Sequence, residues 1–265
     1  MGDGKMSSEI KKTPVLRISG LTKNYNDAPD SRNIIESLDL DVPDGEFLCI
    51  LGPSGCGKTT LIRCIAGFED YTGIIEVDKK KVSKPAIDRI MVFQDFNQLF
   101  PWKTVEKNIQ YPLKKNGITD KEKLKAIAKE HLDLVGLAEY KDFYPHQLSG
   151  GMKQRVAIAK GLALKPKIIL MDEPFASLDA MTRNRLQAEL LNIKQKENVT
   201  VIFITHNIQE AIVLGNRILL MSKDGKIKLD VKNEIQKPVT PASEGYGDMW
   251  KLFNETLQSE LDQKA

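Results

Sequence analysis

A glycine-rich loop at residues 52–60, GPSGCGKTT, constrains this chain more than any other segment. It fits the pattern G-x-x-x-x-G-K-[S/T] and stands between an apolar run, FLCIL, and a helical pattern. Glycine lets backbone N–H groups turn toward phosphate oxygens, the lysine brings a positive charge to the β- and γ-phosphates, and the threonine hydroxyl can bind Mg²⁺. By itself the loop fits GTPases, kinases and many ATPases. The fixed positions are Gly52, Gly57, Lys58 and Thr59.

Strand-like and helical patterns alternate along the rest of the chain. Short, continuously apolar runs are typical of strands that are buried on both faces. Their alternation with helices predicts an α/β chain with a parallel sheet covered on both faces. The expected strands are residues 15–19, 47–51, 90–93, 167–171, 199–204 and 217–221. The expected helices are residues 59–65, 120–134, 152–164, 180–196 and 209–214.

Some segments depart from this alternation and suggest a domain organisation. Residues 34–42, IIESLDLDV, alternate apolar and polar side chains, which predicts a small antiparallel layer with one face in water. A helical subdomain is expected at approximately residues 95–160, inserted into the sheet. The expected divisions are a polar tail at residues 1–13, a main domain at residues 14–237 and a short helical extension at residues 238–265 that carries the amphipathic MWKLFNETLQSEL.

Composition excludes several classes of function. The chain has 265 residues, 41% hydrophobic and 28% charged, which is enough for one or two buried domains and unlike a disordered chain. Its net charge is only +3, with both signs interleaved, so no nucleic-acid partner is expected. No apolar run approaches a membrane span, and the polar N-terminus lacks the apolar core of a secretion signal. Cys49, Cys56 and Cys64 lack metal-ligand spacing, so we expect reduced thiols in a cytosolic protein.

Two further buried strands are expected to end in polar side chains. KIILMDEP, residues 167–174, ends in Asp172 and Glu173, and carboxylates at such a strand end face the nucleotide crevice. Asp172 is expected to hold Mg²⁺ through a water, and Glu173 to take the proton from the attacking water. VIFITHN, residues 201–207, is expected to place His206 beside the same γ-phosphate.

The segment LSGGMKQR, residues 148–155, forms a second candidate anion site. A serine and two glycines precede a helical pattern, and the N–H groups at the start of a helix bind anions. Because the chain already has a phosphate loop, this second segment requires a different role.

Taken together, these motifs resemble the ATP-binding subunit of ABC transporters. The motifs in order are the phosphate loop, Gln94, LSGGMKQR, the acidic strand end, SLD at residues 177–179 and His206. The resemblance covers nearly all of residues 16–229, and LSGG is its most specific element. It implies a P-loop NTPase (RecA-like) core with an antiparallel β-subdomain and an inserted ABC-type α-helical subdomain. It also implies an ATPase that uses Mg²⁺ and converts ATP and water to ADP and phosphate.

The resemblance assigns roles within one subunit. Tyr25 matches the aromatic residue that stacks on adenine, and His206 matches the residue that steadies the γ-phosphate and the attacking water. Gln94 matches a catalytic glutamine that contacts Mg²⁺ and this water. The implied Mg²⁺ ligands are Thr59, Gln94 and Asp172. The implied ATP-binding residues of the loop are Gly52, Pro53, Ser54, Gly55, Cys56, Gly57, Lys58, Thr59 and Thr60.

The same resemblance implies a head-to-tail dimer, most simply of two identical subunits. Ser149, Gly150 and Gly151 match the signature that binds the γ-phosphate of an ATP held by the other subunit. Asp179 matches the loop that crosses between the two sites. Two ATP molecules would therefore lie between two subunits, and their hydrolysis would let the dimer open.

Within the family, several segments look most like the ATPases of nitrate, sulfonate and taurine importers. These segments are PW after Gln94, LSGGMKQRVAIAKGLA, PFASLDAMTR and THNIQEAIVL. This likeness implies a membrane-spanning permease that contacts the loop around Gln94, with Phe100 and Trp102 as weaker candidates. It also implies a solute-binding protein that acts indirectly, and a position on the inner face of the cell membrane. Asn207 departs from the family pattern, because aspartate is usual there.

Other classes of ABC-type ATPase make different demands on the sequence. A soluble ATPase serving translation would carry two cassettes, and a DNA-repair relative would separate Lys58 from Ser149 by a long coiled coil. A soluble ABC-type ATPase in a non-transport role, such as iron–sulfur assembly, could keep all these motifs and stays open as an alternative.

Overall fold

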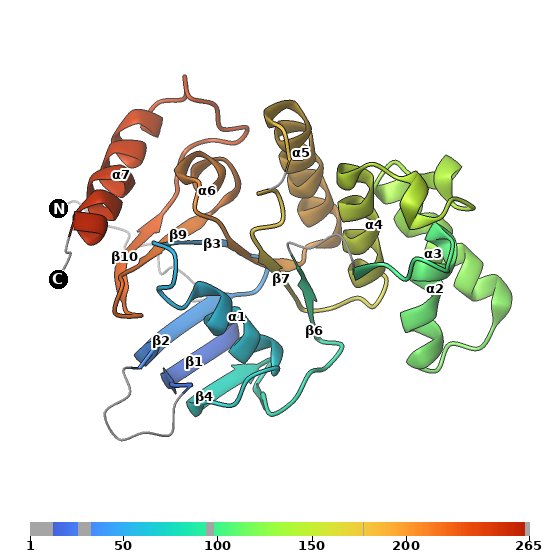
Figure 1. Ribbon diagram of the computed structural model, residues 1–265, viewed down its shortest axis with the longest axis horizontal. Coiled ribbons are helices and arrows are strands. Elements are labelled where there is room, and N and C mark those ends of the chain that lie inside the picture. Colours follow the sequence, from blue (N-terminus) through green and yellow to red (C-terminus); the bar gives the residue numbers. More distant parts are fainter. Residues whose placement is uncertain (1–12, 26–32, 94–97, 177, 263–265) are drawn as a thin grey trace, which may run out of the picture.

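Two β-sheets and the helices around them make up the computed structural model, which describes residues 13–25, 33–93, 98–176 and 178–262 (Figure 1). The larger sheet consists of β3 (Phe47–Leu51), β6 (Arg89–Val92), β7 (Ile168–Asp172), β8 (Thr200–Ile204), β9 (Arg217–Met221) and β10 (Ile227–Lys232). Its strand order is β10-β9-β3-β8-β7-β6, and β3 lies parallel to both of its neighbours. β10 runs antiparallel to β9 at one edge. The expected parallel sheet is confirmed.

Helices lie against the larger sheet and also form a group of their own. They are α1 (Lys58–Ala66), α2 (Val105–Lys115), α3 (Lys121–Leu134), α4 (Gly150–Leu162), α5 (Ala180–Glu197), α6 (Ile208–Leu214) and α7 (Tyr246–Asp262), with short 3-10 turns η2 (Ala138–Tyr140) and η3 (Pro145–Gln147). α2, α3 and α4 pack against one another at one side of the molecule, and α4 also contacts β6 (Figure 1). This group is the expected helical subdomain of the fold. Among the described residues, no helix is both long and apolar enough to cross a membrane.

Alternate residues of the central strands face two separate apolar cores. Leu48 and Ile50 belong to the core that α1 and the smaller sheet complete, whereas Phe47 and Cys49 belong to the core that contains residues of α4, α5 and α6. Every residue of β3 and β8 is buried. A strand covered on both faces has no polar side, which explains why these strands appear in the sequence as continuous apolar runs.

The smaller sheet is antiparallel and has the order β2-β1-β4-β5. Its strands are β1 (Pro14–Lys23), β2 (Ile35–Pro43), β4 (Thr72–Val77) and β5 (Lys80–Lys81). In β2, Leu38, Leu40 and Val42 are buried and alternate with exposed residues, so the expected layer with one face in water is confirmed. The sequence did not predict β4 and β5, which follow α1 and return to the same sheet.

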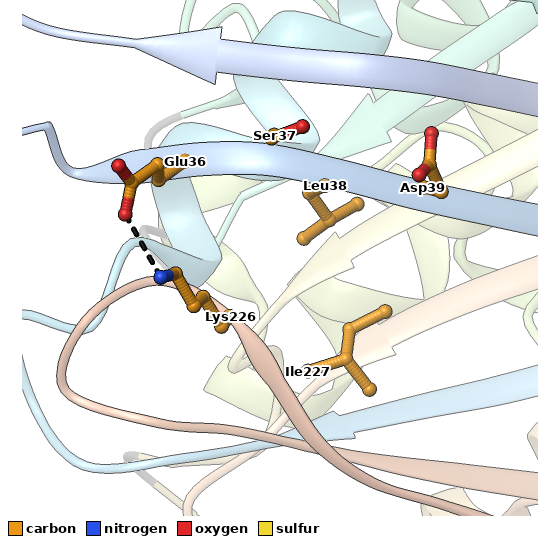
Figure 2. A pocket seen from close by; sticks show the side chains of 6 residues that line it. All are labelled: Glu36, Ser37, Leu38, Asp39, Lys226 and Ile227. Atoms are coloured by element: carbon orange, nitrogen blue, oxygen red, sulfur yellow. Dashed lines mark ion pairs between the residues drawn. The ribbon is translucent and has the colours of Figure 1, made fainter.

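The turn between β9 and β10 packs against the beginning of β2 and joins the two sheets. Gly225 in this turn has φ +70°, and a Cβ there would collide with the carbonyl oxygen of Ile34. Figure 2 shows Lys226 reaching Glu36 across a shallow hollow of about 430 Å³, with 3.0 Å between the charged atoms. Both side chains are exposed, so this ion pair contributes little to stability. The backbone contact at Gly225 therefore fixes the turn.

α7 confirms the amphipathic character of the C-terminal segment. It packs against α6, with Phe253 fully buried in the larger core. Glu260, only 2% exposed, accepts a hydrogen bond from the backbone N–H of Lys223 and lies 3.2 Å from Lys228 Nζ. The helix is thus held by one apolar anchor and one paired carboxylate.

Replacement of Phe253 by alanine is expected to lower the free energy of unfolding by about 3–5 kcal/mol, because it leaves a cavity in a close-packed core. Urea denaturation measures this loss. Trp250 lies on the same helix with 42% of its surface exposed, so Trp250→Ala serves as the control and should change stability little. Equal losses in the two variants would contradict the packing described for α7.

Candidate active site

Close backbone contacts require glycine at two positions of the phosphate loop. Gly57 has φ +99°, and a Cβ there would lie 2.9 Å from the carbonyl oxygen of Ile34. A Cβ on Gly52 would lie 2.8 Å from the carbonyl oxygen of Met221. With glycine at both positions the loop folds tightly onto the start of α1, whose first N–H groups have no partner within the helix. Such a helix start is suited to bind an anion.

The side chain of Lys58 is buried inside this loop. Its Nζ donates hydrogen bonds to the carbonyl oxygens of Gly52 at 2.7 Å and Pro53 at 2.9 Å. A buried ammonium group needs such partners, because desolvation of an unpaired charge is costly. Burial raises the pKa of the nearby Cys56 thiol, which keeps it protonated and fits its interpretation as a small packing residue. The loop thus holds a positive charge beside the start of α1.

Asp172, the last residue of β7, lies next to the phosphate loop. The hydroxyl of Thr59 donates a hydrogen bond of 3.1 Å to its Oδ1. Burial raises the pKa of the Asp172 carboxyl, against the opposing effect of this hydrogen bond. The described residues contain no cluster of three or more His, Cys, Asp or Glu side chains able to hold a metal on their own. A hydroxyl and one carboxylate fit Mg²⁺, which keeps waters and uses phosphate oxygens as further ligands.

Glu173 and His206 meet at the carboxyl edge of the larger sheet. β7 and β8 are parallel with Asp172 opposite Ile204, so the residues that follow each strand are neighbours. Glu173 Oε2 lies 2.9 Å from His206 Nδ1, and the backbone N–H of Glu173 donates to the carbonyl of Ile204. Glu173 has φ +45°, a conformation that costs a non-glycine residue free energy and that concentrates at functional sites. The carboxylate is positioned to accept a proton beside a histidine.

Asn207 has a structural role that explains how it can replace the usual aspartate. It caps the N-terminus of α6, with its Oδ1 accepting a hydrogen bond of 3.2 Å from the backbone N–H of Glu210. Asparagine and aspartate are about equally good at this position, because each offers a side-chain oxygen. The loop that carries His206 therefore keeps its cap.

The signature segment lies at the start of α4, apart from the phosphate loop. Ser149 caps the helix by accepting a hydrogen bond from the N–H of Met152, so α4 begins at Gly150, two residues before the expected start. A Cβ on Gly151 would lie 3.0 Å from the side chain of Thr182 in α5. In the described part of the chain, no hydrogen bond or ion pair joins residues 149–151 to residues 52–60. One copy of the chain does not bring the two anion sites together.

The remaining predicted residues occupy separate places. Tyr25, 51% exposed, lies near the start of α1 with its hydroxyl 3.4 Å from Thr60 Oγ1, and Lys23 Nζ lies 4.8 Å from its ring centroid. Asp179 caps α5, and the backbone N–H of Thr182 lowers the pKa of its carboxyl. Gln94 lies outside the described residues.

Comparison with known proteins supports the same interpretation. A family model described as ABC transporter matches residues 35–176, which is more than half of the chain. The chain belongs to the ABC transporter family. It is an ABC-type ATPase and binds ATP, and the resemblance predicted from its motifs is confirmed.

Related ABC proteins match over most of their length. An ABC transporter ATP-binding protein of Methanocaldococcus jannaschii is 48% identical over 98% of this chain and 97% of its own length. The aliphatic sulfonates import ATP-binding protein SsuB of Bacillus cereus is 40% identical, over 89% of this chain and 93% of that protein. The nitrate import ATP-binding protein NrtD of Synechocystis is 42% identical, over 82% of this chain and 81% of that protein.

Solved ABC cassettes share the fold. A dimeric cassette in a post-hydrolysis state, bound to ADP and phosphate, has a TM-score of 0.72 and 33% identity, covering 83% of this chain and 99% of its own. CbiO1 of Clostridium perfringens, part of an ABC transporter complex, has a TM-score of 0.77 and 26% identity, covering 95% of this chain and 96% of its own. The predicted P-loop NTPase fold is therefore confirmed for this ABC ATPase.

A group of buried and partly buried polar residues beside the Glu173 and His206 pair was not predicted. Thr205, Glu210 and Arg183 line a small cavity together with that pair. The only sequence signal was the glutamate three residues after Asn207, which fits the capping-box spacing and indicates a helix start rather than a site. These residues come next to Glu173 and His206 only through tertiary packing.

Proposed function

We propose that this ABC ATPase is the ATP-hydrolysing subunit of an importer of small anionic solutes such as nitrate, sulfonates or taurine. ATP hydrolysis is supported by two contacting pairs of side chains at one edge of the sheet. One pair is Thr59 with Asp172, and the other is Glu173 with His206. Import and the anionic class of solute are supported by the relatives that serve sulfonate and nitrate import.

The phosphate loop and the strand ends would hold the nucleotide. Lys58 and the backbone N–H groups of residues 52–60 bind the β- and γ-phosphates. Thr59 and Asp172, together with Gln94, would hold Mg²⁺, which neutralises charge on the transferred phosphoryl group. Tyr25 stacks on adenine, a role supported by its exposed ring near the start of α1.

Hydrolysis needs a base and an oriented water. Glu173 takes the proton from the water that attacks the γ-phosphate, and the 2.9 Å contact with His206 orients its carboxylate. His206 steadies the γ-phosphate and the water. The strained backbone at Glu173 supports this assignment, because such conformations persist only where the surroundings impose them.

A second copy of the chain would complete each site. Ser149, Gly150 and Gly151 would bind the γ-phosphate held by the partner's phosphate loop, and Asp179 would lie where the two sites communicate. The separation of the signature from the phosphate loop within one chain supports this arrangement, as does the dimeric ADP-bound cassette. ATP then favours the closed dimer, and hydrolysis releases it.

The membrane-spanning part would belong to partner subunits. Trp102, with 70% of its surface exposed, and Phe100 are candidates for contact with a permease, together with the loop around Gln94. The chain would then lie on the cytoplasmic face of the cell membrane and respond indirectly to a solute-binding protein. The CbiO1 neighbour, which is part of a transporter complex, supports partners of this kind.

Replacement of Lys58 by alanine is expected to weaken ATP binding about 10- to 100-fold, because a charged donor to phosphate is lost. Binding is measured by titration with a fluorescent ATP analogue. Lys237 offers a control, since its Nζ also donates to backbone carbonyls, at 2.5 Å to Val213 and 3.2 Å to Gly215. Lys237→Ala should leave ATP affinity unchanged, and wild-type affinity in Lys58→Ala would contradict the role of the loop.

Purification of the chain with its native membrane partner tests the transport assignment. We expect a complex whose ATP hydrolysis in liposomes rises when a binding protein loaded with sulfonate, nitrate or taurine is added. Stimulation by another solute would change the solute class and keep transport. Co-purification with iron–sulfur assembly factors, without a membrane protein, would favour the non-transport alternative.

A further inference from the structure

A small, partly open cavity of about 30 Å³ lies beside the proposed catalytic pair, which forms part of its lining. Its lining joins three parts of the chain: the segment that follows β7, the helix α5, and the segment from the end of β8 into α6. The lining residues are Glu173, Ala176, Arg183, Thr205, His206, Asn207 and Glu210. Glu210, in the first turn of α6, carries a buried carboxylate; its side chain is 7% exposed.

Glu210 holds the loop that carries His206. Its Oε2 accepts a hydrogen bond of 2.5 Å from the hydroxyl of Thr205, and Thr205 is 1% exposed. The same hydroxyl accepts a hydrogen bond of 3.0 Å from the backbone N–H of Asn207. The residues on both sides of His206 are thus tied to one buried carboxylate, while the His206 side chain itself is 63% exposed.

Glu210 also contacts α5. Arg183 Nε lies 3.5 Å from its Oε1, and Gln187 Nε2 donates a hydrogen bond of 3.4 Å to the same oxygen. Arg183 in turn donates a hydrogen bond of 2.8 Å to the carbonyl of Leu178, the residue before Asp179. Through Arg183 the carboxylate is linked to the segment that begins α5.

The energetics of this group favour one fixed arrangement. Burial raises the pKa of the Glu210 carboxyl, whereas the Thr205 hydrogen bond and Arg183 lower it. A buried carboxylate is tolerated only when its partners are in place, so loss of one partner leaves another group unsatisfied. The arrangement therefore resists small displacements of the His206 loop.

We propose that Glu210 is a positioning residue, which sets the place of His206 through Thr205 and keeps the Asp179 segment in register with it through Arg183. This inference rests on the proposed roles of Glu173 and His206. Glu210 acts through other residues and is not assigned any contact with ATP. Nucleotide affinity depends mainly on the phosphate loop, which Glu210 is not assigned to contact, so the chemical step should respond much more than ATP binding does.

The test compares Glu210→Gln, Thr205→Val and the double variant in the full-length chain, with ATP hydrolysis measured at saturating and limiting ATP. We expect kcat to fall about 10- to 100-fold in each single variant, the scale on which a misplaced catalytic group costs activity. The KM for ATP should change less than about twofold. The kcat of the double variant should lie within about twofold of the kcat of the less active single variant, because both substitutions break the same connection. Thr205→Ser keeps the hydroxyl that Thr205→Val removes, so its kcat should stay close to the wild-type value.

Glu46→Gln is the matched control. Glu46 is a partly buried carboxylate that lies 3.8 Å from Arg217, and its pKa is also raised by burial. Its substitution should leave kcat unchanged, and urea denaturation of all variants separates lost stability from lost positioning. The proposal would be overturned by a wild-type kcat in Glu210→Gln or by losses that add in the double variant. A rise in KM as large as the fall in kcat would also overturn it. Glu173→Gln in the same assay tests the proposed catalytic roles of Glu173 and His206 on which this inference rests. Full activity in that variant would contradict those roles, whatever the result for Glu210.

Discussion

Exchange of Glu173 for glutamine is expected to lower the kcat of ATP hydrolysis about a thousandfold, within the range by which proton transfer to a positioned base accelerates a reaction. The amide keeps the shape of the side chain and cannot take a proton from water. Its neighbours, the carbonyl of Ile204 and the ring of His206, hold the substituted residue in the same place. Binding of ATP uses other groups, so affinity for the nucleotide should stay within about twofold of the wild-type value.

Two measurements follow for this variant. A titration with fluorescent ATP gives the affinity, and size-exclusion chromatography with ATP and Mg²⁺ should reveal a dimer that accumulates because hydrolysis no longer opens it. Undiminished turnover would remove Glu173 as the base. Loss of ATP binding together with turnover would indicate instead that the carboxylate holds the nucleotide.

Replacement of Ser149 by arginine is expected to spare ATP binding and to reduce hydrolysis at least about a hundredfold, because an oxyanion-binding group is removed and a long side chain enters the contact. Ser149 is exposed at the start of α4 and is separate from the phosphate loop of its own chain. The damage should therefore appear in dimer formation. The double variant Glu173→Gln with Ser149→Arg should remain monomeric with ATP, as measured by light scattering. Under the same conditions the single variant Glu173→Gln should form a dimer.

Loss of the helix cap needs its own control, since removing a capping side chain costs about 1 kcal/mol. Thr104 caps α2 in the same way, accepting a hydrogen bond of 3.3 Å from the N–H of Lys107. In the Glu173→Gln background, Thr104→Arg should lose a similar amount of stability and still form the dimer. A Ser149→Arg variant that dimerises normally on ATP would refute the head-to-tail arrangement.

Local sequence determined most of what could be predicted. The phosphate loop before α1 and the acidic end of β7 are each fixed by residues within one short segment, and the structure has both of them in the expected place. α4 begins two residues before the expected start, because the Ser149 cap holds the glycine pair in the first turn of the helix. α2 contains Pro112, which obscures its helical pattern.

The features that were not predicted depend on long-range packing. β4 and β5 are short and largely exposed, and they are strands because β1 supplies an edge for them. Glu210 and Arg183 look like ordinary charged residues on two helices, and only the meeting of α5 with α6 buries the carboxylate between them. Sequence patterns report periodicity and motifs, whereas such contacts depend on which helices become neighbours.

The place of β3 in the larger sheet bears on the order in which the site can arise during synthesis. β3 leads directly into the phosphate loop, yet both strands that flank it, β8 and β9, lie between Thr200 and Met221. A nascent chain that has emerged through α4 contains every residue of the loop and of the signature, but neither hydrogen-bonding neighbour of β3. Parallel pairing over such sequence distances is slow, because a large chain segment must be closed first. The phosphate loop is therefore synthesised early, but the sheet around the strand that leads into it can form only late in folding.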